Sequence, residues 1–551
     1  MNTRVFSIIT LTLLVSVTLF SRFWKIGNLP PSLFADEVDI GYQAMTFNHS
    51  QSDYFGNKFP LHFHSFSDWQ PSFGIYAVAL TQKLTNNPEL SVRLPSAIFG
   101  SLSVFLIYLI TGSIIPSFLL AISPWAIHYS RTGFAVSEMI LFFLLGIYCW
   151  QKFLKTKKTF PLLLSVLFFC LTPYIYSTAK LFLIFLPAIF LYIWKKEIFQ
   201  IPFRTIIVTV TLGLIILTPL AVETLNGKAG FRFSYISIFT EPHREQVTDN
   251  ARYQDAMVDH PNEIGIKTTI ISQIIHNKYQ LVLNRFITNY LSSFSTEFLF
   301  LHGDANIRHG FGNFGLLYII DIVFVFIGLI VGINSKTKLS KLFLTILLFA
   351  PIPFALTRDA NSPHATRLIL MLPSLIYFTS LGINQTIIKL KYSVFAIIII
   401  YSVSFFSFFH YYYYHYPQES AMVWHTGMKE AVIATDQLTA DKIYFSNKYE
   451  PFTPFFLFYK PFLPTNMTAA SSLQHLSNDY FDGSTISNQY YFGHINWNNL
   501  PLQSAYFVIP KSEYVGINNQ NDFTIIDTIS KKYINSEEFY ILKQINAAKN
   551  K

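Results

Sequence analysis

Two adjacent carboxylates, Asp36 and Glu37, follow the first long apolar segment of the chain, with Asp39 close behind them. Ionisable groups beside a membrane span are costly unless they meet cations, a metal ion or a substrate. A carboxylate held within hydrogen-bond reach of a hydroxyl can act as its general base. The same residues also fit a solvated acidic turn at a helix N-terminus, where Asp and Glu are favoured.

Cationic residues recur near the ends of later apolar segments, on what we expect to be the same side of the membrane. Arginine forks can hold the phosphate of a lipid, and anionic lipid headgroups are the alternative partners. We therefore expect these residues and their neighbours to contact a donor phosphate or a substrate. The candidates are Arg93, Arg131, Glu138, Lys180, Arg285, Arg358, His364 and Arg367, and the family resemblance described below adds Asp304 and Arg308.

A divalent metal ion is the one cofactor that the residues leave open. Asp36 and Glu138 could bind it, with His302 or Asp304 as a third ligand, but no ligand spacing in the chain requires a metal.

The elements that position these residues are predicted to be membrane helices. Of the 551 residues, 51% are apolar and only 13% are charged, and the mean hydropathy is +0.36. At about 17 to 25 residues per span, we count about eleven spans. They lie at 5–22, 94–111, 113–128, 135–152, 159–176, 181–194, 205–222, 315–333, 341–356, 368–384 and 393–410. The span at 113–128 is short and interrupted by Pro116 and Pro124, so its ends are the least defined.

Lysine and arginine between the spans predict the orientation. Short basic loops, such as the one containing Lys155, Lys157 and Lys158, are typical of the cytoplasmic side. We therefore expect a cytoplasmic N-terminus, an extracytoplasmic C-terminus and location in the plasma membrane. The long polar loops, 23–93 and 223–314, then lie outside, as does an amphipathic run at 267–300 that we expect on the membrane surface. The basic loops do not suggest a nucleic-acid partner.

The chain changes character after residue 416. Residues 1–416 form the expected membrane module, and 417–551 are polar, with short β-like runs at 442–445, 505–509, 523–526 and 539–542. We predict a small extracytoplasmic α/β domain there.

Taken in order, these motifs resemble a known family. Arg22-Phe23, Pro30-Pro31 and Asp36-Glu37 are followed by Pro71, Ser91-Val92-Arg93-Leu94-Pro95, Ser130-Arg131 and Glu138. Over about the first 380 residues the chain resembles bacterial members of glycosyltransferase family 39, relatives of the protein mannosyltransferases and aminoarabinose transferases with the GT-C fold. The tail does not resemble the sugar-binding domains of the eukaryotic members.

The resemblance implies an all-α polytopic membrane enzyme that transfers a sugar, with inversion, from a polyprenyl-phosphate donor to an acceptor hydroxyl. Asp36 would be the base, Glu37 would orient acceptor or donor, and the cations would hold the leaving phosphate. The acceptor stays open between a protein, a glycan and a lipid. Two other functions remain: a lipid-linked glycan ligase or polymerase, and a lipid or glycan transporter. A transporter should carry charges at its span centres, which are almost free of charge here.

Overall fold

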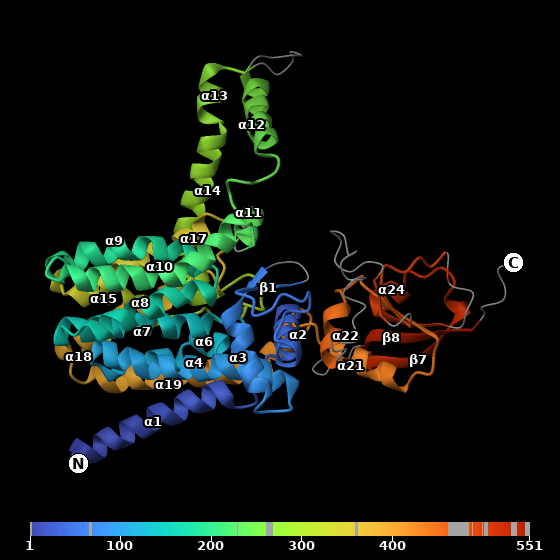
Figure 1. Cartoon of the computed structure of the whole chain (residues 1–551), viewed down its shortest axis with the longest axis horizontal. Helices are drawn as coiled ribbons and strands as arrows, with labels where there is room; N and C mark the ends of the chain where they lie inside the picture. The colour runs from blue at the N-terminus through green and yellow to red at the C-terminus, as the bar shows by residue number, and fades with distance from the viewer. Residues whose placement is uncertain are drawn as a thin grey trace. The chain divides into compact units, whose positions relative to one another are not determined.

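The structure is a computed structural model that describes residues 3–65, 69–228, 230–259, 268–358, 362–460, 484–486, 489–498, 500, 505–530 and 537–545. The chain forms two compact units, described separately here (Figure 1). Unit 1 joins residues 1–102 and 127–138 to 406–551, and unit 2 contains 103–126 and 139–405. The predicted boundary between 416 and 417 therefore falls inside unit 1, because residues 23–93, called the first outer loop after their predicted side, and the C-terminal residues fold together.

Unit 2 is helical. Its elements are α5 (Ile114–Ile122), α8 (Thr159–Leu171), η1 (Thr172–Tyr174), α9 (Thr178–Ile198), α10 (Phe203–Leu225), α11 (Phe231–Ile236), α12 (Arg244–Asp259), α13 (Ile270–Ile275), α14 (Lys278–Ser292), η2 (Glu297–Leu301), α15 (Asp321–Ser335), α16 (Lys338–Phe349), α17 (Ile352–Ala355), η3 (Ile369–Met371) and α18 (Leu372–Lys389). Four helices have residues in both units: α4 (Pro88–Thr111), α6 (Pro124–Tyr129), α7 (Val136–Thr156) and α19 (Ser393–Tyr414).

Each predicted span overlaps at least one described helix, and the predicted number of eleven spans stays a prediction. Six described helices are long and apolar enough to cross a membrane, namely those at 88–111, 136–156, 178–198, 203–225, 338–355 and 393–414. Shorter apolar helices lie at 7–23, 159–174 and 321–335. The Pro-interrupted span divides into α5 and α6, and the span predicted to start at 315 begins as α15 at Asp321. The chain is a membrane protein, as its composition predicted.

Small residues let two of these helices approach closely. A Cβ atom on Gly328 of α15 would overlap the carbonyl oxygen of Phe378 on α18, and one on Gly382 would overlap the carbonyl of Phe324. Interfaces between membrane helices favour such small residues, because lipid offers no hydrophobic drive for association. This contact fixes α15 against α18 in the bundle (Figure 1).

Unit 1 begins with α1 (Thr3–Phe23) and α2 (Ala35–Ser50), a hairpin of β1 (His62–His64) and β2 (Trp69–Pro71), and α3 (Ser72–Gln82). Its C-terminal part contains α20 (Tyr416–Ser420), α21 (Met428–Ala434), η4 (Thr435–Gln437), β3 (Lys442–Ser446), α22 (Thr453–Tyr459), β4 (Ser484–Ile486), β5 (Tyr490–Gly493), β6 (Ala505–Pro510), α24 (Lys511–Tyr514), η6 (Gln520–Asp522), β7 (Phe523–Ser530) and β8 (Glu537–Gln544).

The C-terminal strands form one mixed sheet in the order β4-β5-β3-β6-β8-β7. β3 runs parallel to β5 and β6, whereas β4, β7 and β8 pair antiparallel. Side chains alternate between the two faces, so Phe445 and Val508 join one apolar core while Phe507 and Ile509 join another. The α/β domain and all four predicted β runs are confirmed.

Candidate active site

Asp36 and Glu37 occupy the first turn of α2 but point to different surroundings. Asp36 is exposed, whereas Glu37 is completely buried. Each Glu37 carboxylate oxygen accepts two N–H groups: Oε1 from Arg93 Nε (3.1 Å) and Gly133 N (2.8 Å), and Oε2 from Arg93 Nη2 (3.2 Å) and Phe34 N (3.1 Å). Glu37 thereby fixes the start of the helix that presents Asp36.

The guanidinium of Arg93, on α4, is fully buried against Glu37. Its remaining N–H groups donate to backbone carbonyl oxygens where the first outer loop leaves α1. The acceptors are the carbonyls of Ile26 (3.2 Å), Pro30 (2.8 Å) and Ser32. All five donors of Arg93 thus have protein acceptors. The ring of Trp424 lies 5.7 Å from the guanidinium carbon.

Arg131 is equally buried and binds the same stretch of backbone. Its two terminal nitrogens donate to the carbonyls of Ser21 (3.0 Å), Arg22 (3.2 Å), Trp24 (2.8 Å) and Leu29 (3.2 Å). The last carbonyls of a helix lack partners within the helix, so Arg131 satisfies the C-terminal end of α1. The Tyr412 and Tyr413 rings lie 5.7 Å and 5.3 Å from its guanidinium carbon.

Glu138, in the first turn of α7, is also buried. Its Oε1 accepts the hydroxyl of Ser96 at 2.9 Å, and no described residue donates to its buried Oε2. A buried carboxylate oxygen without a donor is costly, and the role of Glu138 in binding substrate stays a prediction.

Asp39 lies one turn beyond Asp36 on α2 and is buried. It accepts hydrogen bonds from Tyr54 (3.0 Å), Ser65 (2.6 Å) and Gln70 Nε2 (2.9 Å). Burial raises the pKa of Asp39 to about 7; its bonds to Ser65 and Tyr54 lower the pKa, and nearby Asp36 raises it. Because the three donors belong to the first outer loop, Asp39 holds that loop against the face of α2 that presents Asp36.

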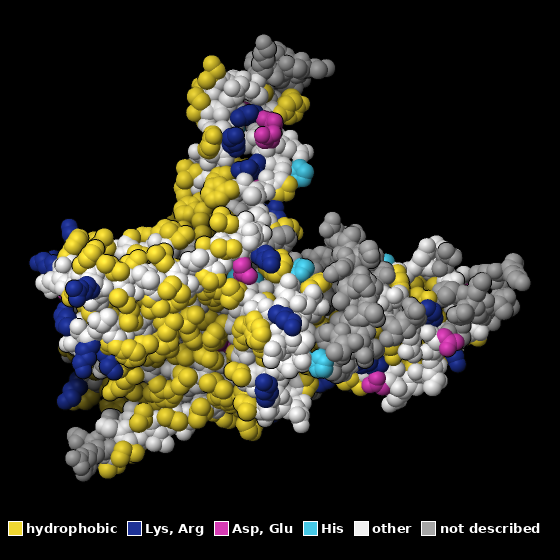
Figure 2. Space-filling view, in the orientation of Figure 1, with side chains coloured by type: hydrophobic (Ala, Val, Ile, Leu, Met, Phe, Trp, Pro, Cys, Tyr) yellow, Lys and Arg dark blue, Asp and Glu magenta, His cyan; other side chains and the backbone are white. Residues whose placement is uncertain are grey.

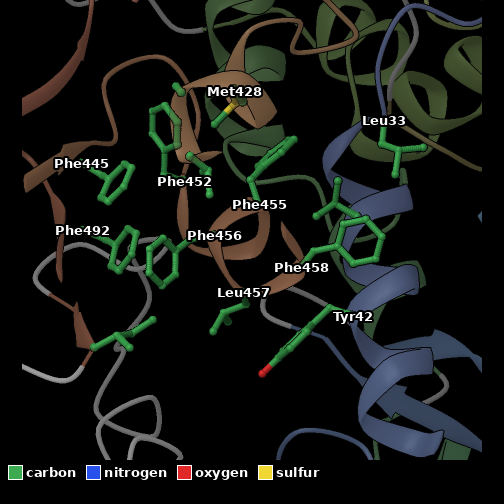
Figure 3. Packing of buried hydrophobic residues seen from close by; sticks show 14 of the residues in the cluster. Leu33, Tyr42, Met428, Phe445, Phe452, Phe455, Phe456, Leu457, Phe458 and Phe492 are labelled. Atoms are coloured by element: carbon green, nitrogen blue, oxygen red, sulfur yellow. The ribbon is translucent and has the colours of Figure 1, made fainter. Parts of the chain in front are cut away.

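The C-terminal domain packs directly on α2. Figure 3 shows Phe458 of α22 directed toward Tyr42 and Leu33, in one apolar cluster with the sheet residues Phe445 and Phe492. A Cβ atom on Gly41 would collide with the Phe458 ring, so glycine is needed for this close approach. Lys429 of α21 adds a salt bridge to Glu89 at the start of α4. The domain therefore supports the helix that carries Asp36.

Unit 2 brings together four of the residues predicted to contact the donor or substrate. Asp304 accepts Asn306 N (2.9 Å) and Ala365 N (2.8 Å), which joins the 302–310 loop to the turn containing His364 and Arg367. His364 Nδ1 lies 3.7 Å from Asp304, its ring lies 4.7 Å from that of His309, and Arg308 Nε donates to His309 Nε2 at 3.4 Å. We call Asp304, Arg308, His309, His364 and Arg367 the cationic turn.

Burial raises the pKa of Asp304 to about 6; its hydrogen bonds from Ala365 and Asn306 and the charges of Arg367 and Arg308 oppose this increase. Arg308, His364 and Arg367 are only partly buried, unlike Arg93 and Arg131. The cationic turn therefore presents positive charge around a carboxyl group at a surface of unit 2.

The other candidates of unit 2 lie apart from these contacts. The Arg358 guanidinium carbon is 4.8 Å from the ring centre of Tyr235, and Arg285 pairs with Glu241 at 2.7 Å. Lys180 lies in the first turn of α9 and is half-buried.

Sequence reasoning gave no role to Asp39, His309 or Trp424. The sequence could have indicated Asp39, because residues 36 and 39 are three positions apart and therefore lie on the same side of a helix. His309 and Trp424 depend on contacts between segments far apart in the chain. The described residues contain no group of three or more His, Cys, Asp or Glu that could hold a metal ion, and the role of Asp36 and Glu138 as ligands stays a prediction.

Comparison with solved structures gives low similarity. The apo structure of ArnT from Cupriavidus metallidurans matches with 12% identity and a TM-score of 0.42, with 100% of both chains covered. The apo oligosaccharyltransferase from Archaeoglobus fulgidus matches with 11% identity and a TM-score of 0.46 over 82% of this chain and 63% of that chain. This chain therefore spans less than two thirds of the length of the oligosaccharyltransferase. At these TM-scores the likeness carries no conclusion about activity.

No match was found among curated protein sequences. A family model does match, and it covers the segment that contains Arg93, Arg131, Glu138 and Lys180. It begins after the Asp36-Glu37 pair. The resemblance drawn from the sequence is thus confirmed over residues 70–222, which match the dolichyl-phosphate-mannose-protein mannosyltransferase family.

Proposed function

We propose that the protein is an inverting glycosyltransferase that moves a sugar from a polyprenyl-phosphate donor to an acceptor hydroxyl at the outer face of the plasma membrane. The observation that carries this proposal is the contrast within one turn of α2. Asp36 is exposed while its neighbour Glu37 is buried in a saturated network with Arg93 and Gly133. A carboxylate on so rigid a support is suited to meet a substrate at a defined position.

In the proposed step, Asp36 accepts the proton of the acceptor hydroxyl. The acceptor oxygen forms a bond to the anomeric carbon from the face opposite the donor phosphate. The bond between that carbon and the phosphate oxygen breaks, and its electron pair leaves with the polyprenyl phosphate. Attack from the opposite face inverts the anomeric configuration, and a base within reach of the hydroxyl contributes roughly 10² to 10⁴ in rate.

The structure supports dividing the predicted cations between two roles. The guanidinium groups of Arg93 and Arg131 donate their hydrogen bonds to Glu37 and to backbone carbonyls. We therefore propose that Arg93, Arg131 and Glu37 hold the first outer loop in position. The leaving phosphate gains negative charge in the transition state, and preorganised cations stabilise such charge. We assign that role to the partly buried Arg308, Arg367 and His364 of the cationic turn.

The matched family supports the choice of donor, because its description names a sugar carried on a lipid phosphate. An enzyme at the outer face has no access to nucleotide-sugars, so the sugar must arrive already activated. Basic residues at one end of the bundle, such as Lys195 and Lys196 in the last turn of α9, support a cytoplasmic location for that end. The N-terminus is then inside, and Asp36 and the C-terminal domain are outside.

The test uses the purified full-length protein in nanodiscs with radiolabelled polyprenyl-phosphate hexoses and pentoses, and a membrane extract as the source of acceptor. We expect label to leave the lipid, and we expect Asp36→Asn to reduce the initial rate at least about 10²-fold. Asp441→Asn is the matched control, because Asp441 is an exposed carboxylate in the C-terminal domain.

Equal rates for wild type and Asp36→Asn would refute the base assignment. Transfer of whole glycan chains from lipid pyrophosphate, with no use of monosaccharide donors, would replace the proposal by a ligase or polymerase. Identifying the labelled product then distinguishes a protein, a glycan and a lipid acceptor.

A further inference from the structure

An arm built from α12, α13 and α14 extends from the helical bundle of unit 2. In Figure 1, α13 and α14 follow one another and run across the direction of the bundle helices α9 and α10, with α12 alongside. Side-chain caps define both helix starts: Thr269 accepts from Ser272 N, and Asn277 accepts from Tyr279 N and Gln280 N. The arm is thus a defined element of the outer loop 223–314.

One face of the arm is apolar and exposed. Along α14 the apolar residues recur at every fourth position, as Tyr279, Leu283, Ile287 and Leu291. Their exposed fractions are 76%, 50%, 44% and 62%. On α13, Ile270, Ile271, Ile274 and Ile275 are also exposed. Polar residues form a neighbouring stripe on α14, at Gln280, Asn284 and Thr288. Leaving such an apolar face in water is unfavourable.

The polar side of α13 contacts α12. The Asp255 carboxylate on α12 accepts the hydroxyl of Ser272 at 2.8 Å and lies 3.0 Å from His276 Nε2. Arg252, also on α12, donates to the carbonyl of His276 at 2.6 Å. Ser272 and His276 lie on the side of α13 opposite its exposed isoleucines, so the apolar face of α13 is directed away from α12.

The root of the arm is fixed to the chain that leads into the cationic turn. Asn289 is fully buried, and its Nδ2 donates to the carbonyl of Thr357 at 2.7 Å. Tyr290 donates its hydroxyl to the carbonyl of Leu348 at 2.8 Å. These bonds leave little freedom for α14 to rotate, so the direction of the apolar face is set by the fold.

The apolar face continues the surface that the bundle offers to lipid. Exposed apolar side chains cover α10, among them Leu214, Ile215 and Leu225, and Figure 2 shows this surface passing onto one side of the arm. The two basic residues of α14, Lys278 and Arg285, lie on the side of the helix away from the apolar stripe, and Arg285 pairs with Glu241. An in-plane helix inserts its apolar side at the boundary of headgroups and acyl chains and keeps its charged side in water.

We propose that α13 and α14 lie in the outer leaflet, with their apolar face in contact with acyl chains, and anchor the outer loop of unit 2 to the bilayer. Lipid is favoured over another protein because the face is continuous with the lipid-facing surface of the bundle. This proposal does not depend on the glycosyltransferase activity. It predicts that the loop joined to the arm root, including Arg358, is held close to the level of the lipid phosphates.

The test compares adjacent positions on the apolar and the polar stripe of α14, whose side chains point about 100° apart. Leu283→Cys and Asn284→Cys are each labelled with an environment-sensitive fluorophore, in full-length protein in nanodiscs of phosphatidylethanolamine and phosphatidylglycerol at one protein copy per disc. The native Cys149 and Cys170 are buried, so wild-type protein serves as the blank for labelling. Ile287→Cys and Thr288→Cys form a second pair, in case substitution at 283 disturbs folding.

We expect the probes at 283 and 287 to lose most of their emission when the acyl chains are brominated and to resist aqueous iodide. Probes at 284 and 288 should behave in the opposite way. Equal quenching by iodide at 283 and 284 would overturn the proposal. Protection at 283 that appears only with two protein copies per disc would also overturn it, since the occupant would then be a second copy of this chain.

Discussion

The arginines of the first outer loop and those of the cationic turn look alike in the sequence but differ in their surroundings. Arg93 and Arg131 are fully buried, and their terminal nitrogens meet Glu37 or the carbonyls of residues 21–32. Arg308 and Arg367 are partly exposed around Asp304. A buried guanidinium surrounded by carbonyl oxygens fixes backbone, whereas a partly exposed one is accessible to a phosphate even when it also has a protein partner, as Arg367 has in Thr357. Under the proposed function, some arginines position the site and others contact the donor phosphate.

The largest effect should come from breaking the buried pair. Arg93→Met leaves the Glu37 carboxylate charged and buried, and removes the donors to three carbonyls, which should cost about 3 to 5 kcal/mol of stability. We expect a marked fall in the thermal unfolding midpoint in nanodiscs, with loss of donor turnover as a consequence. Glu37→Gln keeps acceptor capacity for Gly133 N and should be milder. Normal stability of Arg93→Met with lost donor binding would instead make Arg93 a phosphate ligand.

The cationic turn should show the opposite behaviour. Arg367→Gln removes a charge that we assign to the leaving phosphate, and its loss should lower kcat/KM for the lipid-linked sugar about 10²-fold with little change in the unfolding midpoint. Arg244→Gln, at the start of α12, is the matched control and should leave both values unchanged. If Arg367→Gln instead unfolds the protein while activity per folded molecule is retained, the two sets of arginines do not differ in role.

Hydropathy and spacing predicted much of this architecture. Each apolar run of the required length coincides with a helix, and the β-like runs coincide with β3, β6, β7 and β8. These features are local, since a span needs only enough consecutive apolar residues and a strand needs only β-forming residues. The parallel arrangement of β5, β3 and β6 is not local, because β3 pairs with segments that follow it by more than 40 residues.

The sequence suggested which residues to consider for the site, and their roles stay a prediction; it did not suggest that they divide into a buried and a partly exposed set. Asp304 and Arg367 were both expected near a substrate, and the structure places them within electrostatic reach of one another. The role of Arg131 could not be predicted. The local sequence around an arginine at the outer end of a span is the same whether its side chain binds a phosphate or the last carbonyls of α1. That choice depends on how the chain from 21 to 32 folds back over it. The packing of α22 on α2 likewise needs tertiary contacts.

Asp39 gives a pH-dependent test of the first region alone. Its pKa is about 7 in the folded protein against an ordinary 3.8, so between these values the folded state keeps a proton that the unfolded state releases. Asp39 therefore contributes stability that is complete below about pH 4 and is lost as the pH rises toward 7, at about 1.4 kcal/mol per pH unit at most. Asp39→Asn should remove this slope.

The measurement is the unfolding midpoint of wild type and Asp39→Asn in nanodiscs between pH 4.5 and 8, in steps of about half a pH unit. Asp304 also has a raised pKa, about 6, so the difference between the two proteins isolates Asp39. Parallel curves for both proteins would show that Asp39 is ionised throughout this range, and that the buried network of the first loop tolerates a charge.

The smallest effect should come from an ion pair of unit 2 with the same chemistry as the Arg93–Glu37 pair but with access to water. Arg285 and Glu241 lie 2.7 Å apart, and their side chains remain 26% and 15% exposed. Water solvates either partner when the other is removed, so Glu241→Gln should cost no more than about 1 kcal/mol. We expect an unfolding midpoint close to that of wild type and unchanged donor turnover, measured beside Glu37→Gln as the buried counterpart. A loss for Glu241→Gln as large as that for Arg93→Met would mean that burial does not separate the two regions. In that case the Arg285–Glu241 pair would hold residue 241 against α14 as firmly as Glu37 holds the start of α2.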